Sequence, residues 1–270
     1  MQLTVNDVLS KPQTIPSIPK VVTQLIESFN DPSPDIVQIA KLIEHDEGIA
    51  IKVLRLANTS KFGSARQVSS VQDASVRLGL DSLRTLVLAS GLTAAVTKVP
   101  HLDLKQFWTR SFDVADVGGE LAGPAGIKPD SMKTIGMLHN IGEVALHNSA
   151  PEQALVVVAC VANGDQRAAA ETKEMGVTSA EVGSEMVRRW RLPEFVCEAI
   201  GQQHEPELIE AKLLRVAMQV VKDKGIEYGE APPAHFPVQL LEDLGIMWPS
   251  VKHAHDVLIE HGNQFAELLG

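Results

Sequence analysis

The chain has 270 residues, of which 44% are hydrophobic and 21% charged, and its formal net charge at pH 7 is −10. This composition is typical of a globular protein and excludes a disordered chain or a membrane protein. Because an excess of negative charge repels phosphate backbones, we expect no nucleic acid partner.

The sequence also indicates where the protein works in the cell. No apolar run approaches the roughly 20 residues that a membrane-spanning helix needs. The segment MQLTVNDVLSKPQ at the start lacks the basic and apolar regions of a signal peptide. The two cysteines, Cys160 and Cys197, match no metal-binding or redox spacing and are typical of buried thiols in a reducing compartment. We therefore expect a cytoplasmic protein without membrane contact.

The hydrophobic pattern of the first hundred residues is helical. Ser33-Pro34-Asp35 has the sequence of a helix start, and the apolar residues between 36 and 43 follow at i, i+3, i+4 and i+7. Residues 47–58 are apolar on more than one side, which predicts a helix packed between others. Two further helices are predicted over 71–78 and from Asp81 to about residue 97, with Gly79 between them. The apolar faces of this region are too extensive to be left in water, so we expect them to pack against the rest of the chain.

The remainder of the chain continues in the same way. Helices are predicted over 104–122, 130–147 and 207–224, and Leu192-Pro193 separates two more. The residues at 149–152 and 178–181 have the spacing of capping boxes. The first of these precedes LVVVACVA, whose valines favour a strand, but the cap and the following Asn163-Gly164 favour a helix. Residues 225–237 form a loop and 240–269 an amphipathic tail. No alternation of period two occurs, so the predicted fold class is all-α.

One short stretch, MLHNIG at residues 137–142, places His139 and Asn140 inside an apolar helical pattern. A histidine followed by an aspartate on a helix is the centre of a known metal site, because imidazole and carboxylate together can hold divalent cations. Here the second residue is an asparagine, which keeps an oxygen but has no charge.

The surrounding segments resemble the HDOD family, a branch related to the HD-domain metal-dependent phosphohydrolases. The resemblance runs from residue 15 to about residue 225 and includes the motif W-x-LP at 190–193. The chain departs from the family pattern at Glu47-Gly48, where the family usually has a proline. The segments that carry it are IPSIPKVV (15–22), EHDEGIAIKVLRLANTSKFG (44–63), SVQDASVRLGLDSLRTLVL (70–88), FWTRSFDVA (107–115), GMLHNIGEVAL (136–146), GVTSAEVGSEMVRRWRLPEFVCEAI (176–200) and QHEP (203–206).

The resemblance implies three regions: an N-terminal helical lobe over 1–100, an HD-like helical lobe over 101–224, and a loop with a C-terminal helical tail over 225–270. It also implies where the metal ligands of the related hydrolases would fall. Those positions are occupied by a vestigial set, namely Arg110, His139, Asn140, Ser179, Gln203, His204 and Met218.

This set does not suit a hydrolytic dinuclear centre. Such a centre needs anionic and imidazole ligands to offset four positive charges. Met218 is a soft donor, and Arg110 brings a permanent cation. Two like unit charges about 4 Å apart repel each other by about 4 kcal/mol at an effective dielectric near 20. We therefore expect no bound metal or cofactor and no hydrolase activity.

Three interpretations of His139 and Asn140 remain. They are buried polar groups that hydrogen-bond across the helices, or they line a pocket in which Arg110 binds an anion or a nucleotide phosphate, or they belong to an altered metal site. From the family resemblance we expect a non-catalytic regulatory or protein-interaction module of bacterial signal transduction, with a signalling protein as partner. The alternatives are a metal-dependent phosphohydrolase and a nucleotide or anion sensor.

Overall fold

Helix is the only regular secondary structure in residues 2–11, 14–27, 35–59, 67–263, 265 and 268, which are the residues that the computed structural model describes. The all-α prediction is therefore confirmed. The helices are α1 (Val5–Leu9), α2 (Lys20–Glu27), α3 (Ile36–Glu44), α4 (Glu47–Ala57), α5 (Val71–Ala95), α6 (Leu104–Ala122), α7 (Pro129–Leu138), α8 (Ile141–Ser149), α9 (Pro151–Ala162), α10 (Arg167–Met175), α11 (Ser179–Arg189), α12 (Glu194–Gly201), α13 (Ile209–Lys222), α14 (Val238–Leu244) and α15 (Trp248–His261).

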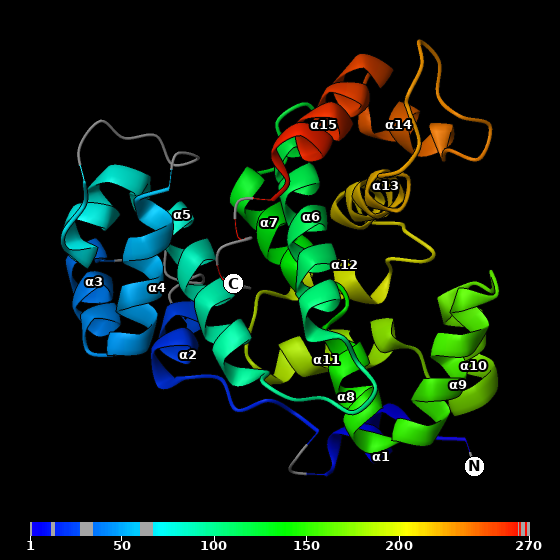
Figure 1. Ribbon diagram of the computed structural model, residues 1–270, viewed down its shortest axis with the longest axis horizontal. Coiled ribbons are helices and arrows are strands. Elements are labelled where there is room, and N and C mark those ends of the chain that lie inside the picture. The colour runs from blue at the N-terminus through cyan, green and yellow to red at the C-terminus, as the bar shows by residue number, and fades with distance from the viewer. Residues whose placement is uncertain are drawn as a thin grey trace.

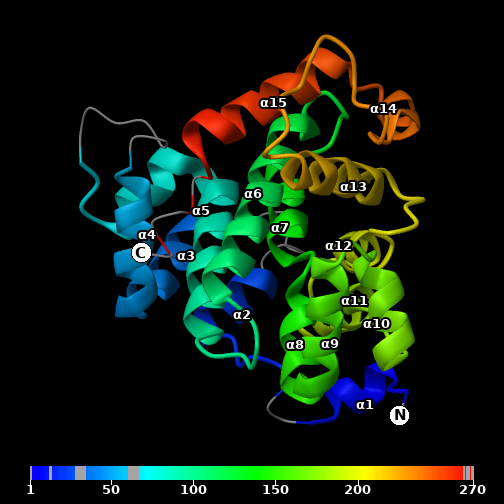
Figure 2. The same cartoon turned by 45° about the vertical axis from the view of Figure 1, so that its right-hand side comes forward.

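Two lobes share one hydrophobic core. Helices α2 to α5 form the smaller lobe at the left of Figure 1, and the paired helices α6 and α7 run through the middle of the molecule. Figure 2 shows α6 and α7 between α5 on one side and α13 on the other, and α5 packs on α7. A single buried cluster contains Ile43 and Leu83 from the small lobe together with Phe112 and Ile135 from the large one. The predicted contact between the two halves is present.

The first helix crosses to the large lobe. Helix α1 lies beside α8 and α11 (Figure 1), and the backbone N–H of Leu3 donates to the carbonyl of Met175 at 2.7 Å. Arg189 donates to the carbonyl of Leu9 at 3.0 Å. Residues 3–9 are thus held by the lobe that follows residue 100, although the division of the chain into folding units at that residue stays a prediction.

Local capping chemistry explains several helix starts and corrects two predictions. Asp35, and not Ser33, is the N-cap of α3, because its side chain accepts from the backbone N–H groups of residues 37 and 38; residues 33 and 34 lie outside the described part. The capping box predicted at 149–152 is wrong, since Ala150 is the N-cap of α9 and makes no side-chain bond. The helix after it is confirmed, as is the capping box in which Thr178 and Glu181 bond reciprocally.

Gly79 interrupts α5 as the sequence predicts. Its φ of 76° and ψ of 166° break the helical backbone in a region of conformational space that L-residues with a Cβ avoid. The bend turns the second half of α5 along the large lobe, where Leu83, Leu86 and Leu92 are buried.

The predicted tail is two helices joined to an anchored loop. Asp223, at the end of α13, accepts from the Tyr228 hydroxyl at 3.0 Å and from His235 Nε2 at 2.9 Å. Tyr228 is fully buried and stacks on His255 of α15 with ring centroids 4.0 Å apart. Among the described helices there is none with the length and apolar character required to cross a bilayer.

Candidate functional site

The predicted helix over 130–147 is broken at the His-Asn pair. Helix α7 ends at Leu138 and α8 begins at Ile141, and Asn140 between them has φ −108° and ψ 9°. The break is fixed by close helix packing, because a Cβ on Gly142 would clash with the Ser179 carbonyl and approach the Gly183 nitrogen to 2.7 Å. The side chains of residues 139 and 140 lie at this junction.

A cavity of about 690 Å³ opens at this junction. Its long walls are α6 and α13, and its floor is the α7–α8 junction with the start of α11 and the end of α12. Residues 164–168, which connect α9 to the first residues of α10, complete it. All seven residues of the predicted set line this one cavity: Arg110, His139, Asn140, Ser179, Gln203, His204 and Met218.

His139 is a buried and neutral imidazole. Its Nδ1 lies 2.6 Å from the carbonyl of Gly136, and only 3% of the residue is exposed. Burial lowers the pKa of His139 to about 4, and the nearby charge of Arg110 acts in the same direction. At neutral pH the Nδ1 proton is therefore donated to Gly136, which leaves Nε2 as an acceptor.

Asn140 is buried beside Ser111 of α6. The Ser111 hydroxyl lies 2.8 Å from Asn140 Oδ1 and 2.9 Å from the Phe107 carbonyl, and its single proton can serve either acceptor. The Nδ2 group of Asn140 has no hydrogen-bond partner among the described residues. The hypothesis that the His-Asn pair consists of buried, hydrogen-bonded polar groups therefore fits His139, but it fits Asn140 only in part.

The guanidinium of Arg110 is neutralised by a buried acid. Its Nη2 donates to Oε1 of Glu143 at 2.6 Å, and Nη1 of Arg167 lies 3.3 Å from Oε2 of the same carboxylate. Burial alone would raise the pKa of Glu143, but the charges of Arg110 and Arg167 outweigh it and hold that pKa below its usual range. Glu143 is therefore ionised inside the molecule, where only 4% of its side chain is exposed.

Ser179 is bonded to a second buried acid. Its backbone N–H and its hydroxyl donate to Oε2 of Glu171 at 2.7 and 2.9 Å. Burial raises the pKa of Glu171 to about 7, against the effect of those two bonds, and the negative charge of Glu143 adds to the rise. Ser179 thus lies at the start of α11 and has its hydrogen-bonding groups committed to that acid.

Gln203, His204 and Met218 complete the predicted set. Gln203 is buried, and its Nε2 donates to the His139 carbonyl at 2.9 Å, so it ties α12 to the α7–α8 junction. His204 and Met218 are half-buried on the cavity wall. Burial lowers the pKa of His204, and the positive charges of Arg215 and Arg167 lower it further.

The model of the HDOD domain family matches residues 15–206, a span that includes every residue of the predicted set except Met218. This chain is a member of the HDOD family.

Two crystal structures of similar fold and one protein of similar sequence illustrate the relationship. A crystal structure of a candidate phosphohydrolase from Shewanella amazonensis is 29% identical, covers 98% of both chains and has a TM-score of 0.81. An HDOD domain protein of unknown function from Geobacter sulfurreducens is 24% identical over 98% of this chain and 91% of its own, with a TM-score of 0.75. An uncharacterised protein of Treponema pallidum is 26% identical over 235 residues, or 84% of this chain; the chain spans about 45% of that protein's length.

The cavity of this HDOD chain does not suit a pair of divalent cations. No group of three or more His, Cys, Asp or Glu side chains able to hold an ion occurs within the described ranges. His139 and His204 keep imidazole nitrogens, but Glu143, the acid beside them, is already bound by Arg110. The Met218 thioether prefers Cu(I) to Mg²⁺, Mn²⁺ or iron. The residues present therefore do not fit a hydrolytic dinuclear centre.

Sequence reasoning missed the ionic partners in this HDOD cavity. Glu143 follows His139 by four residues and is a single acid in the apolar run IGEVAL, which was a usable signal. Arg215 lies with Met218, Gln219 and Lys222 at the spacing i, i+3, i+4 and i+7 on α13, so its position could have been inferred once Met218 was placed in the site. Nothing in the sequence brings Arg167 to this place, because it depends on how the α9–α10 hairpin folds back.

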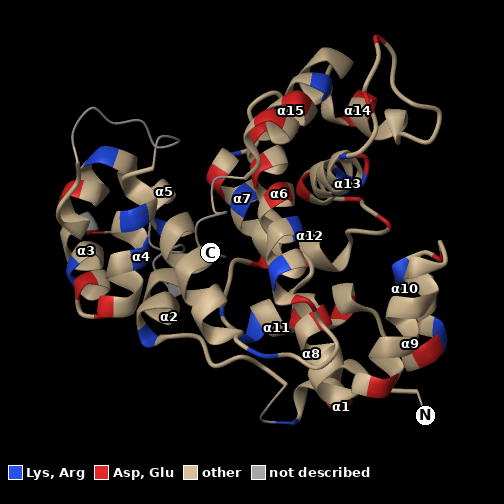
Figure 3. Cartoon of the chain, viewed as in Figure 1, with Lys and Arg blue, Asp and Glu red and all other residues tan. Residues whose placement is uncertain are grey.

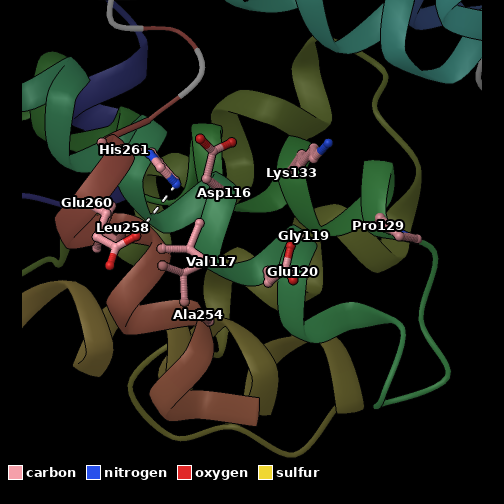
Figure 4. Close-up of a pocket in the computed structure, with 12 residues that line it drawn as sticks. Asp116, Val117, Gly119, Glu120, Pro129, Lys133, Ala254, Leu258, Glu260 and His261 are labelled. Atoms are coloured by element: carbon pink, nitrogen blue, oxygen red, sulfur yellow. Dashed lines mark ion pairs between the residues drawn. The ribbon is translucent and has the colours of Figure 1, made fainter. Parts of the chain in front are cut away.

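A second cavity lies between α6, the start of α7 and α15 (Figure 4) and has a volume of about 870 Å³. Its charged side chains include Asp116, Glu120 and Glu260, against Lys133, and Glu260 lies 3.7 Å from Nε2 of His261. The HDOD match gives no ligand position here, and the mixed charges show no preference for one kind of ligand.

Proposed function

We propose that this chain is a non-catalytic HDOD-type regulatory module of bacterial signal transduction that acts by binding a protein partner. One observation carries the non-catalytic part of the proposal. The Arg110 guanidinium, 2.6 Å from Glu143, lies at the position where the family resemblance expects a histidine ligand. Arginine does not lose its proton in proteins, so this group cannot coordinate a cation at any accessible pH.

The charge arrangement supports the same conclusion. A divalent ion near Arg110 would be repelled by about 4 kcal/mol for each pair of like unit charges at 4 Å and an effective dielectric near 20. The carboxylate that could offset this repulsion, Glu143, also faces Arg167 at 3.3 Å. Two guanidinium groups beside the α7–α8 junction thus supply the positive charge that metal ions would supply in a hydrolase.

The alternative function is metal-dependent hydrolysis of a phosphate ester. The Shewanella amazonensis relative, which is 29% identical, is named a candidate phosphohydrolase. In this alternative, His139 and His204 would be the surviving ligands, and both line the cavity. Loss of charge at Asn140 and of the acid at residue 218 argues against it.

Metal analysis with an activity assay separates the two functions. The purified protein, incubated with Mn²⁺ or Fe²⁺ and desalted, is assayed for bound metal and for hydrolysis of bis(p-nitrophenyl) phosphate. We expect far less than one ion per chain and no turnover that EDTA abolishes. Stoichiometric metal with EDTA-sensitive turnover would establish the alternative.

A triple variant provides the matched positive control. Arg110→His, Asn140→Asp and Met218→Asp together restore the charges and donors that the family resemblance expects at these positions. This variant should retain more Mn²⁺ than the wild type after desalting, because its ligand set offsets the charge of the ion. Equal retention by both proteins would show that these three residues do not explain the absence of metal binding.

For the partner contact we propose the loop 225–237 between α13 and α14. Ile226, Glu227 and Glu230 are exposed there, whereas Tyr228 is buried and holds the loop backbone in place. A rigidly held loop with exposed apolar and charged side chains is suited to recognition. Replacing Ile226 and Glu230 by Ser should abolish the signalling output that depends on this chain in the cell, without changing the melting temperature of the protein. An unchanged signalling output would exclude this loop as the partner contact.

A further inference from the structure

The HDOD cavity has a local excess of positive charge. Five Lys or Arg side chains line it, against three Asp or Glu, although the whole chain carries a net charge of −10. Acidic and basic segments are interspersed over both lobes (Figure 3), so this excess is a property of the cavity and not of one half of the molecule.

Two of these cations are neutralised within the protein. Arg110 donates to Glu143, as described above, and Nζ of Lys224 donates to Asp113 at 2.9 Å. Asp113 is itself held by Nδ2 of Asn263 at 2.8 Å, which fixes the α6 wall. These two cations are therefore committed to the protein's own acids.

The cations on α13 are not neutralised in this way. No hydrogen bond or ion pair joins the side chain of Arg215 or Lys222 to another residue in the described part of the chain. Arg167 lies 3.3 Å from Glu143 and 3.7 Å from Glu171, with no hydrogen bond to either acid. Three positive groups thus face the cavity with incomplete compensation.

Arg215, Arg167 and His204 line the same cavity. Both guanidinium groups come from different segments, α13 and the start of α10, and the charge of each lowers the pKa of the half-buried His204 imidazole. A third group faces the same cavity from its floor. Asn140, which is 4% exposed, has an Nδ2 group without a partner among the described residues. An unpaired buried donor, one guanidinium group without an ion pair and one that is only partly compensated together suit a ligand with negatively charged acceptor oxygens.

We propose that this cavity binds the phosphate group of an organic phosphate without a metal ion, with Arg215 as the principal contact and Arg167 and Asn140 as further donors. The planar fork of a guanidinium matches two phosphate oxygens at once, and a phosphate monoester offers three such oxygens. Arg110, which the sequence indicated for this task, does not serve it because Glu143 already holds it.

The size and walls of the cavity indicate that the ligand has an organic part. A volume of about 690 Å³ lies within the range of roughly 300–1,000 Å³ found for small-molecule sites and far exceeds one inorganic anion. Val114, Val161 and Val221 supply apolar wall, and Lys222 lies about 10 Å from Arg215 along α13, at 1.5 Å per residue. The phosphate would bind at Arg215 and the organic part toward Lys222.

A thermal-shift titration in EDTA tests the proposal. The probes are inorganic phosphate, a set of phosphate monoesters consisting of AMP, GMP and glucose 6-phosphate, and adenosine as the organic part alone. We expect at least one monoester to raise the melting temperature with a lower half-saturation concentration than inorganic phosphate, and adenosine to have no effect. No shift from phosphate or from any of the three monoesters at about 100 times a millimolar Kd would overturn the proposal.

Matched variants identify the contact. Arg215→Gln should weaken binding about 10- to 100-fold, the range that corresponds to one lost hydrogen bond to a charged group. Arg215→Lys should recover part of the affinity. Lys212→Gln removes the same charge from the same helix, where Lys212 pairs with Asp243 at 2.6 Å, and should bind like the wild type. An affinity that Arg215→Gln leaves unchanged would overturn the proposal, and Arg167→Gln serves the same purpose if the first variant does not fold.

The inference rests on the proposed function only in treating the cavity as free of metal. Binding that requires added Mn²⁺ would contradict both this inference and the non-catalytic function. A metal-free protein that binds none of the probes would contradict this inference alone.

Discussion

At the scale of single residues, Glu143 holds the site together. Its carboxylate is buried between the helices and shared by Arg110 and Arg167, at 2.6 and 3.3 Å. Removing one partner of a buried ion pair leaves the other charge without full compensation, which is more unfavourable than removing both. The ion pair is therefore part of the folded state and forms without a ligand.

A double-mutant cycle on this pair tests that statement. Arg110→Gln should lower the free energy of unfolding by about 2 kcal/mol, because Glu143 keeps only the weaker contact with Arg167. The double variant with Glu143→Gln should be more stable than the sum of the single effects predicts, by about 1–3 kcal/mol. Urea denaturation measures all four proteins. As a control, Arg188→Gln removes two exposed pairs, with Glu194 and Glu185, and should cost less than about 1 kcal/mol. Strictly additive effects at Arg110 and Glu143 would contradict the account.

Glu171 gives a pH-dependent prediction. Its pKa is raised from 4.5 to about 7 in the folded protein, so between these pH values the folded state keeps a proton that the unfolded state has lost. The contribution of Glu171 to stability is therefore complete below pH 4.5 and is lost as the pH rises to 7, by up to about 3 kcal/mol.

The variant Glu171→Gln isolates this effect from other titrations. His139, whose pKa falls to about 4, acts in the opposite direction, because its contribution is lost as the pH falls from 6.5 toward 4. Because both proteins contain His139, its effect cancels in the comparison. The free energy of unfolding of Glu171→Gln minus that of the wild type should therefore increase from pH 5 to pH 8. A difference that is the same at both pH values would show that Glu171 titrates normally.

At the scale of elements, the contact between α8 and α11 determines where the His-Asn pair lies. Gly142 permits that contact, because its Cα faces the backbone of Ser179 and Gly183. Any side chain at residue 142 would push the two helices apart and tilt the α7–α8 junction toward the cavity.

Gly142→Ala should consequently destabilise the protein by about 3 kcal/mol, at the upper end of what overpacking of a core costs. Gly123→Ala is the matched control, since nothing lies within 4 Å of the position that its Cβ would occupy, and its φ of −57° suits any residue. The control should change the free energy of unfolding by less than about 1 kcal/mol in either direction. Equal effects of the two substitutions in urea denaturation would contradict the close packing of α8 on α11.

Local chemistry explains which elements the sequence could predict. The helix over 104–122 has an Asp at its N-cap and a glycine after its end, and the structure has the same bounds. The helix α1, with five residues, is too short to show a period, and α10 has few apolar residues. The break at residues 139–140 depends on packing against α11, which no local pattern records. The seven candidate positions were found through the family resemblance. Glu143 and Arg215 carried sequence signals that were not used, whereas Arg167 required the tertiary structure.

At the scale of the whole molecule, the continuous core predicts that both lobes unfold together. Buried residues from α2 to α5 and from α6 to α15 belong to one cluster, and α1 packs on the large lobe. Proteins with one core unfold in a single transition when no part retains enough buried surface to remain folded alone.

The tryptophans make this testable without labels. All three, Trp108, Trp190 and Trp248, follow residue 100, so fluorescence reports on the large lobe, whereas circular dichroism at 222 nm reports on all helices. The two thermal melting curves should coincide. An early loss of ellipticity without a change in fluorescence would show that the small lobe unfolds by itself.

The central claim is that two guanidinium groups and a buried carboxylate occupy the place of a metal centre. A crystal soaked in MnCl₂ and measured at the manganese absorption edge tests it most directly. We predict no anomalous peak within coordination distance of His139, Asn140 or His204, and a guanidinium of Arg110 bonded to Glu143. One or two strong anomalous peaks between those side chains, with Arg110 displaced from Glu143, would contradict the account.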